Sequence, residues 1–226
     1  MERENVRQMS ETFRLGALLA LAGGFLDAYT YLTRDGVFAN AQTGNLVLLG
    51  MSLASRQWAR VMHYLVPILA FAGGVVVAEL VKRRFRRSPG LHWRQIVLGA
   101  EILLLVLVSF LPAQLNTVAN VVVSFICAMQ VESFRKVHGN AFTTTMCTGN
   151  LRSGTERLFL YLTTGEADHR RRAGQYYGII LCFVAGAALG VAVSGWLGIR
   201  SVLVAGAFQL AAFLLMFRAE SSCTRD

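Results

Sequence analysis

Eight largely apolar stretches, several of them near the length of a membrane-crossing helix, constrain the fold of this chain more than any other feature. They occupy residues 14–33, 37–55, 60–82, 94–111, 115–136, 140–162, 172–196 and 200–217. The stretches are continuous rather than alternating, which favours helices over the strands of a membrane barrel. Only 15% of the residues are charged, whereas soluble domains carry about a quarter. We therefore expect an all-α polytopic membrane protein.

A polar triplet recurs in the two halves of the chain. Thr43-Gly44-Asn45 is repeated as Thr148-Gly149-Asn150, and an acid stands sixteen residues before each copy, Asp27 and Glu132. The offset between the halves is 105 residues for both the acid and the triplet. A doubled, helix-breaking signature in an apolar chain indicates two related halves with a site at their interface.

A second match between the halves has a slightly larger offset. Phe71 and Gly74 match Phe183 and Gly186 at 112 residues, and the seven extra residues lie in the loop Thr163–Arg172. Small residues at these positions would let helices approach each other closely. The chain then has four parts: a polar tail (1–13), a first membrane repeat (14–111), a second membrane repeat (115–217) and a polar tail (218–226).

The number of crossings depends on whether the two triplet segments span the bilayer or re-enter it. With six crossings, 18 of the 22 lysines and arginines lie in the cytoplasm, whereas eight crossings split them 12 against 10. The positive-inside rule therefore favours six. Arg152, Glu156 and Arg157 would also be costly at the centre of a spanning helix. We expect two inverted repeats with six spanning helices and two discontinuous, re-entrant triplet segments; the alternative is eight spanning helices, because segment 37–55 is long enough to cross.

Each triplet is expected to mark a break in a helix, followed by a new helix start. Glycine breaks helical regularity, threonine can hydrogen bond to freed backbone groups, and asparagine is a good N-cap. The new start would present N–H groups and the positive end of the helix dipole. Two such starts, one from each inverted half, would meet at a central site suited to a polar or anionic ligand.

Asp27 and Glu132 precede the two breaks, and an acid inside a membrane segment is a functional hypothesis by default. Each could carry a proton, bind a cation or accept a hydrogen bond from a substrate. Each could instead be structural, pairing with Arg34 or Arg135 or capping the broken helix. The predicted substrate or ion site comprises Asp27, Asn40, Gln42, Thr43, Gly44, Asn45, Glu132, Asn140, Thr145, Thr148, Gly149 and Asn150. Weaker candidates for a pathway are Glu101 and Gln209.

Composition argues against several other classes of protein. The net charge of +9 comes from basic residues clustered in loops, which indicates cytoplasmic retention and contact with anionic lipid rather than nucleic acid. The four cysteines form no CxxC pair and the four histidines are scattered, so we expect no metal site and no cofactor. No nucleophile–base or nucleotide-binding motif is present, and we expect no enzyme activity.

Three motifs resemble those of the bacterial YoaK family, also called the DUF1275 family. They are Gly24-Phe25-Leu26-Asp27-Ala28, Ala39-Asn40-Ala41-Gln42-Thr43-Gly44-Asn45 and Thr143-Thr144-Thr145-Met146-Cys147-Thr148-Gly149-Asn150. The resemblance covers roughly residues 12–218 and implies a small bacterial inner-membrane protein with six transmembrane segments. It implies no substrate and carries over no catalytic residues. One departure is that Met129 and Gln130 stand where the first half has Gly24 and Phe25.

From these patterns we expect a multi-pass protein of the bacterial cytoplasmic membrane that acts as a small secondary transporter or permease. Its solute would be a small polar or anionic molecule, coupled to protons through Asp27 and Glu132. A repeat unit of this size would suit a homodimer. The alternatives are a channel, in which the paired breaks form a constriction, and a membrane scaffold or regulator that transports nothing.

Overall fold

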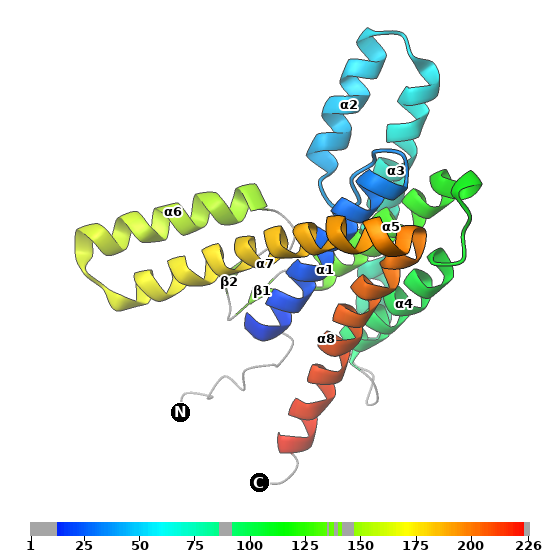
Figure 1. The fold of residues 1–226 in the computed structure, drawn as a ribbon. Helices are drawn as coiled ribbons and strands as arrows, with labels where there is room; N and C mark the ends of the chain where they lie inside the picture. The colour runs from blue at the N-terminus through cyan, green and yellow to red at the C-terminus, as the bar shows by residue number, and fades with distance from the viewer. Residues whose placement is uncertain (1–12, 86–91, 135, 138–139, 142–146, 224–226) are drawn as a thin grey trace.

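A computed structural model describes residues 13–85, 92–134, 136–137, 140–141 and 147–223, with side chains described as far as residue 216 and not in the two short ranges. Within these ranges the chain is almost entirely helical (Figure 1), which confirms the predicted all-α class. The helices are α1 (Phe13–Thr33), α2 (Gln42–Ala54), α3 (Trp58–Phe85), α4 (Trp93–Val108), α5 (Asn116–Ser133), α6 (Cys147–Thr164), α7 (Ala167–Leu197) and α8 (Val202–Cys223). Shorter elements are the 3-10 helices η2 (Ala113–Leu115) and η3 (Gly198–Ser201) and an antiparallel pair of two-residue strands, β1 (Lys136–Val137) and β2 (Asn140–Ala141).

The helices follow the eight predicted stretches, but the two triplet helices begin later than expected. α2 begins at Gln42 and α6 at Cys147, so each triplet lies inside the first turn of a helix rather than before it. The predicted role of Asn45 as an N-cap is wrong, because Ala41 is the N-cap of α2 and makes no side-chain capping hydrogen bond. The acceptor for this helix start comes from a different helix, as described below. At the other end of the chain, α8 continues to Cys223, into the predicted polar tail.

Local sequence explains several helix boundaries. His92 is the N-cap of α4 and forms a capping box with Gln95. The His92 side chain accepts a hydrogen bond from the Gln95 backbone N–H, and the Gln95 side chain accepts one from the His92 backbone N–H. Gly198 ends α7 with a positive φ of 54°, a conformation that glycine adopts without a steric penalty. The turn at Gly198 separates α7 from α8, which then runs back along the core (Figure 1).

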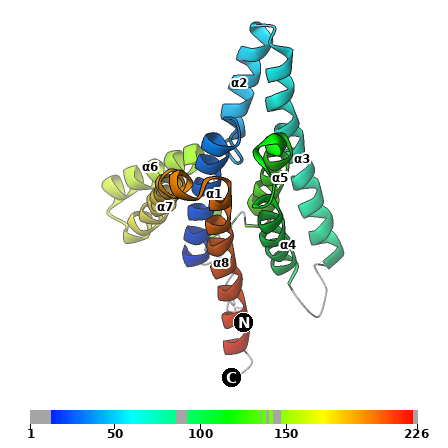
Figure 2. The same cartoon turned by 45° about the vertical axis from the view of Figure 1, so that its right-hand side comes forward.

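Helices of each half pack mainly against helices of the other half. α1 lies along α7, and α5 lies along α3 (Figures 1 and 2). Within the halves, α2 packs on α3 and α6 packs on α7; α4 contacts α5 and α8, and α8 contacts α1. Replacing each helix by its counterpart four places along the chain reproduces these contacts. The two halves are therefore interlocked, and the main core lies where α1, α4, α5 and α8 meet.

Two matched glycines allow the interlocking helices to approach closely. A Cβ added to Gly186 of α7 would collide with the backbone of Leu21 in α1, and a Cβ added to Gly74 of α3 would collide with the backbone of Phe125 in α5. These are the glycines that matched at an offset of 112 residues in the sequence. The close helix approach expected from them is present in both halves.

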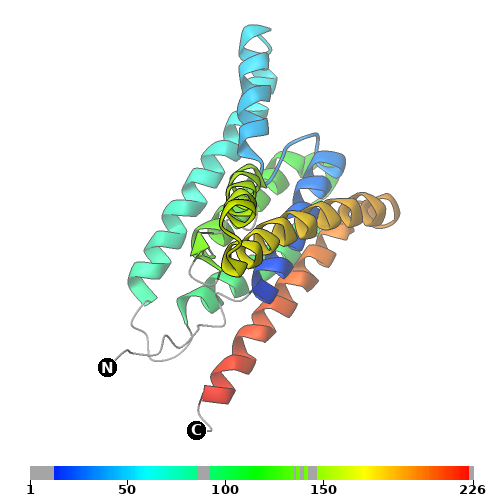
Figure 3. The same ribbon diagram turned by 90° about the vertical axis from the view of Figure 1, so that its left-hand side faces the viewer.

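The α2–α3 and α6–α7 hairpins project from the rest of the molecule in different directions (Figures 1 and 3). Large apolar side chains are exposed on them, among them Leu46, Val47, Met51, Phe159, Leu162 and Leu181. By length and composition, the described residues contain four candidate membrane spans: Phe13–Thr33, Trp58–Phe85, Ala113–Ser133 and Ala167–Met216. The last of these includes both α7 and most of α8. Most of the long helices therefore expose apolar side chains that could face lipid.

Candidate functional site

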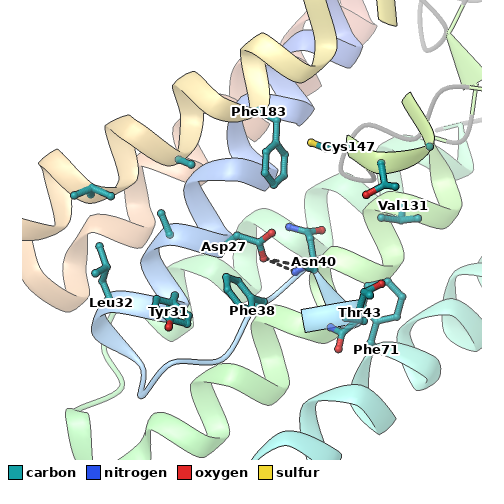
Figure 4. A pocket seen from close by; sticks show the side chains of 17 residues that line it. Asp27, Tyr31, Leu32, Phe38, Asn40, Thr43, Phe71, Val131, Cys147 and Phe183 are labelled. Carbon is teal, nitrogen blue, oxygen red and sulfur yellow. Dashed lines mark hydrogen bonds between the residues drawn. The ribbon is translucent and has the colours of Figure 1, made fainter. Parts of the chain in front are cut away.

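A cavity of about 800 Å³ lies between the two halves, where the starts of α2 and α6 approach α1 and α7 (Figure 4). Thr43 of the first triplet lines this cavity, and so do Thr148 and Gly149 of the second. Asp27 of α1 and Cys147 at the start of α6 complete its polar edge. The two copies of the triplet, 105 residues apart in the sequence, therefore reach one cavity.

The rest of the cavity wall is apolar and aromatic. Phe71 of α3 and Phe183 of α7, which matched at an offset of 112 residues, both line it. Phe38 lines it as well and stacks on Tyr31 of α1, with 4.7 Å between the ring centroids. None of these aromatic residues was among the predicted site residues. The Phe71–Phe183 match was the available signal, since it identified corresponding positions on the two long helices.

Asp27 supplies the acceptor for the start of α2. Its Oδ1 accepts hydrogen bonds from the backbone N–H groups of Asn40 at 2.6 Å and Ala41 at 3.4 Å (Figure 4). The carboxyl is 6% exposed and also lines the cavity. A negative group beside a helix start is favoured by the helix dipole. Asp27 therefore anchors the two residues that precede α2, and this places its carboxyl at the cavity.

The other polar residues before and within α2 hold the chain in place at this start. Asn45 bridges back to Phe38: its Oδ1 accepts from the Phe38 N–H at 3.0 Å and its Nδ2 donates to the Phe38 carbonyl at 2.7 Å. Asn40 and Gln42 both line the cavity, and each also donates a side-chain hydrogen bond to a backbone carbonyl. Gly44 packs against the Phe38 ring and leaves no room for a Cβ there. Asn45 thus orients the loop, while Asn40, Gln42 and Thr43 face the cavity.

Fewer of the candidates in the second half are described. Asn150 is 2% exposed and does not line the cavity. Thr145 lies outside the described residues, and of Asn140 only the backbone is described, in β2. The contribution of the second triplet to the cavity is therefore that of Thr148 and Gly149, in the first turn of α6.

Glu132, the counterpart of Asp27, does not line the cavity. It is 8% exposed and hydrogen bonds with Glu79 of α3, which in turn forms an ion pair with Lys82 at 2.6 Å. The two acids matched in the sequence are therefore in different surroundings, because α3 carries Glu79 where the corresponding position of α7 carries Val191.

The two weaker candidates, Glu101 and Gln209, are brought together away from the cavity. Gln209 Nε2 of α8 donates to Glu101 Oε2 of α4 at 3.1 Å, and both side chains are fully buried. Gln209 also donates to Gln130 of α5, a residue that the sequence analysis did not select. The pair forms its own polar cluster in the core.

Among the residues that the structure describes, no lysine, arginine or histidine lines the cavity. In the part of the chain that the structure describes, no group of three or more histidine, cysteine or acidic side chains could hold a metal ion. The positive features at the cavity are the helix starts, where N–H groups and the dipole favour a negative or polar group. Asp27 lies beside the start of α2, and Cys147, Thr148 and Gly149 line the cavity at the start of α6.

Comparison with known proteins supports the resemblance seen in the motifs. A family model described as "Protein of unknown function (DUF1275)" matches residues 15–215 of the chain. The chain is also 28% identical over 146 residues to the UPF0700 transmembrane protein YoaK of Bacillus subtilis (strain 168). That match covers 63% of this chain, and the chain spans 65% of the length of the curated relative. No solved structure matches the chain.

Proposed function

The chain is a membrane protein that belongs to the DUF1275 family, and we propose that it is a small multi-pass transporter whose substrate binds in the cavity between its two halves. The observation that carries this proposal is the position of the cavity: helix starts from both halves, each with a Thr-Gly-Asn triplet, meet there. Sites at the interface of repeats, built from helix starts, are typical of secondary transporters.

The lining of the cavity supports a solute with an apolar body and one polar or negatively charged group. Phe38, Phe71 and Phe183 would contact the body, since aromatic and aliphatic walls usually provide most of the contact with a small ligand. The first turn of α6, with Thr148 and Gly149, would receive the polar group. A weak organic acid fits both features.

Protonation of Asp27 would couple the binding of a solute in this cavity to the binding of a proton. An ionised Asp27 would repel an anion in the same cavity, whereas a protonated Asp27 would not. Proton binding at Asp27 and anion binding at α6 would therefore favour each other, as reciprocal linkage requires. Glu132 has no such role in this proposal, because it lies away from the cavity beside Glu79.

We also propose six crossings of the bacterial cytoplasmic membrane, with α2 and α6 entering without spanning. α2 has 13 residues, which at about 1.5 Å per residue is about 20 Å, short of the roughly 30 Å hydrocarbon core. α6 carries Arg152, Glu156 and Arg157 and is not among the candidate spans. The matching contacts of α1 with α7 and of α5 with α3 support two inverted repeats, because three crossings per half reverse the second half.

The test is solute exchange by purified protein in liposomes, after a thermal-shift screen of small carboxylic acids has identified one that stabilises it. A carrier should show saturable uptake and counterflow of labelled solute. Flux that neither saturates nor exchanges would indicate a channel, and the absence of both stabilisation and flux would contradict transport.

Proton coupling is tested with Asp27→Asn. Asn retains an acceptor oxygen for the Asn40 and Ala41 N–H groups but does not titrate, so we expect counterflow to persist and uptake driven by a pH gradient to be lost. Asp35→Asn is the matched control, because Asp35 is exposed and does not line the cavity. Gradient-driven uptake that survives in Asp27→Asn would remove Asp27 from the coupling mechanism.

A further inference from the structure

A cluster of buried polar side chains joins α4, α5 and α8 outside the cavity. Gln209 Nε2 donates to Glu101 Oε2 at 3.1 Å and to Gln130 Oε1 at 3.0 Å, and Gln130 Nε2 donates to the Leu19 carbonyl of α1 at 3.1 Å. Glu101 and Gln209 are 0% exposed and Gln130 is 1% exposed. The cluster ties four helices from both halves together at their common core.

Two oxygens in this cluster have no hydrogen-bond partner among the described residues: Glu101 Oε1 and Gln209 Oε1. They belong to the same carboxyl–amide pair, whose other two atoms are already hydrogen bonded. If Glu101 were ionised, both oxygens would be acceptors without a donor, and a buried carboxylate without a cation would carry a large desolvation cost. A neutral carboxyl has an O–H group, which is the donor that the pair lacks.

We propose that Glu101 binds a proton at Oε1 and donates it in a hydrogen bond to Gln209 Oε1, so that the pair is a proton-binding site between α4 and α8. With that proton in place the carboxyl and the amide donate to each other, and every atom of the pair has a partner. A bound metal cation explains the pair less well. Hard cations take about six oxygens, whereas the pair offers two without partners.

The titratable groups nearest to this site lie on α1 and α5. The Cys127 thiol of α5 lies beside the Asn40 side chain and is close enough to both Asp27 and Glu101 to experience their charges. The described side chains of α8 include no charged group, and on α3, which also contacts α4, Glu79 is paired with Lys82.

The position of the site suggests what it does, and this step rests on the transport function proposed above. Losing the proton would leave a carboxylate between α4 and α8, one of the pairs of helices that contact each other across the halves. The contact would weaken, so the protonation of Glu101 would control how firmly the halves are held.

Infrared spectroscopy of the purified full chain tests the proton directly, without any transport measurement. We expect the wild type at neutral pH to show the C=O stretch of a protonated carboxyl that Glu101→Gln removes and Asp27→Asn retains. Glu101→Gln preserves the geometry, since its new amide can donate to Gln209 Oε1. Gln209→Leu should shift the band, because it removes both the donor and the acceptor of the carboxyl.

The pH dependence of thermal unfolding gives a second readout. A glutamate in water ionises at about pH 4.3. Above that pH, the folded wild type would keep the proton on Glu101, whereas the unfolded chain would have lost it. Its stability should therefore fall as the pH rises, and this fall should be smaller in Glu101→Gln.

Three outcomes would overturn the proposal. One is a carboxyl band that is unchanged in Glu101→Gln, and another is a band that sodium ions remove at constant pH, which would indicate a cation site. The third applies if Glu101→Gln does not fold. The wild-type carboxyl band would then be titrated, and its frequency compared with that in Gln209→Leu. An unchanged frequency in Gln209→Leu would contradict the hydrogen bond between Glu101 and Gln209. A confirmed band in a protein that shows no flux would keep this site and reject the transport function.

Discussion

Arg34 is the largest side chain that is fully buried among the described residues. Its hydrogen-bond partners are carbonyl oxygens and the Tyr29 hydroxyl, to which its Nε donates at 2.8 Å, rather than a carboxylate. Its guanidinium donates to the Leu111 carbonyl at 3.0 Å, to Asn116 Oδ1 at 2.9 Å and to the Val108 carbonyl at 3.2 Å. These acceptors lie at the end of α4 and in the connection to α5, where the negative end of the α4 dipole favours a cation. Arg34 therefore binds the C-terminal end of α4 and does not form the pair with Asp27 that was one expected alternative.

The contribution of these Arg34 contacts to stability can be measured by substitution. Arg34→Lys should lower the free energy of unfolding by at least about 2 kcal/mol, because an ammonium cannot reproduce the fork of donors that reaches three backbone or side-chain oxygens. Chemical denaturation in detergent micelles measures the change, and Arg60→Lys is the control, since Arg60 is exposed. Equal stability of the two variants would show that the carbonyl contacts of Arg34 contribute little.

At the scale of helices, the close contacts of α3 with α5 and of α7 with α1 hold the interlocked halves together. Each contact contains one of the matched glycines, Gly74 or Gly186, whose missing side chain lets two backbones approach. In the contact of α1 with α7, Gly24 of α1 also lies directly against the backbone of Phe183. Within the membrane, such packing replaces the hydrophobic effect as the main attraction between helices. These contacts therefore connect the sequence match between the halves directly to their assembly.

Gly74 and its neighbour Gly73 provide a matched pair of substitutions on α3. Gly74→Ala should destabilise the protein by about 1–3 kcal/mol, because the new methyl group meets the backbone of Phe125 and the side chain of Ala128. Gly73→Ala meets nothing within 4 Å and should leave stability unchanged or raise it by up to about 1 kcal/mol through helix propensity. Thermal unfolding of both variants measures these changes in stability. If Gly74→Ala were as stable as the wild type, α3 and α5 could move apart at little cost in free energy.

At the scale of the whole molecule, the proposal of six crossings makes a prediction about two loops. Arg56 follows α2, and Asp168 follows α6. If both triplet helices enter and leave on the same side, the Arg56 loop lies outside and the Asp168 loop inside. Reporter fusions at the two positions in living cells should therefore give opposite signals. The same signal at both positions would favour eight crossings.

The class of the protein, the approximate positions of its helices and its family could be predicted from the sequence. These depend on local properties, namely continuous apolar stretches and a repeated motif, which remain visible in one dimension. The helix boundaries at α2 and α6 were less accurate, because the acceptor for the start of α2 is Asp27, a residue of another helix. An acceptor that belongs to another helix leaves no signal in the sequence next to α2.

Which residues share a site became clear only from the packing of the helices. Thr43 and Thr148 meet at the cavity because α1 packs on α7 and α3 packs on α5, an exchange that the repeat did not specify. The two matched acids are separated for the same reason: Asp27 faces the cavity, whereas Glu132 faces Glu79. Glu101 and Gln209 became a pair through the contact of α4 with α8. Helix periodicity fixes which face of a helix is apolar, but the partner of that face depends on packing between distant segments.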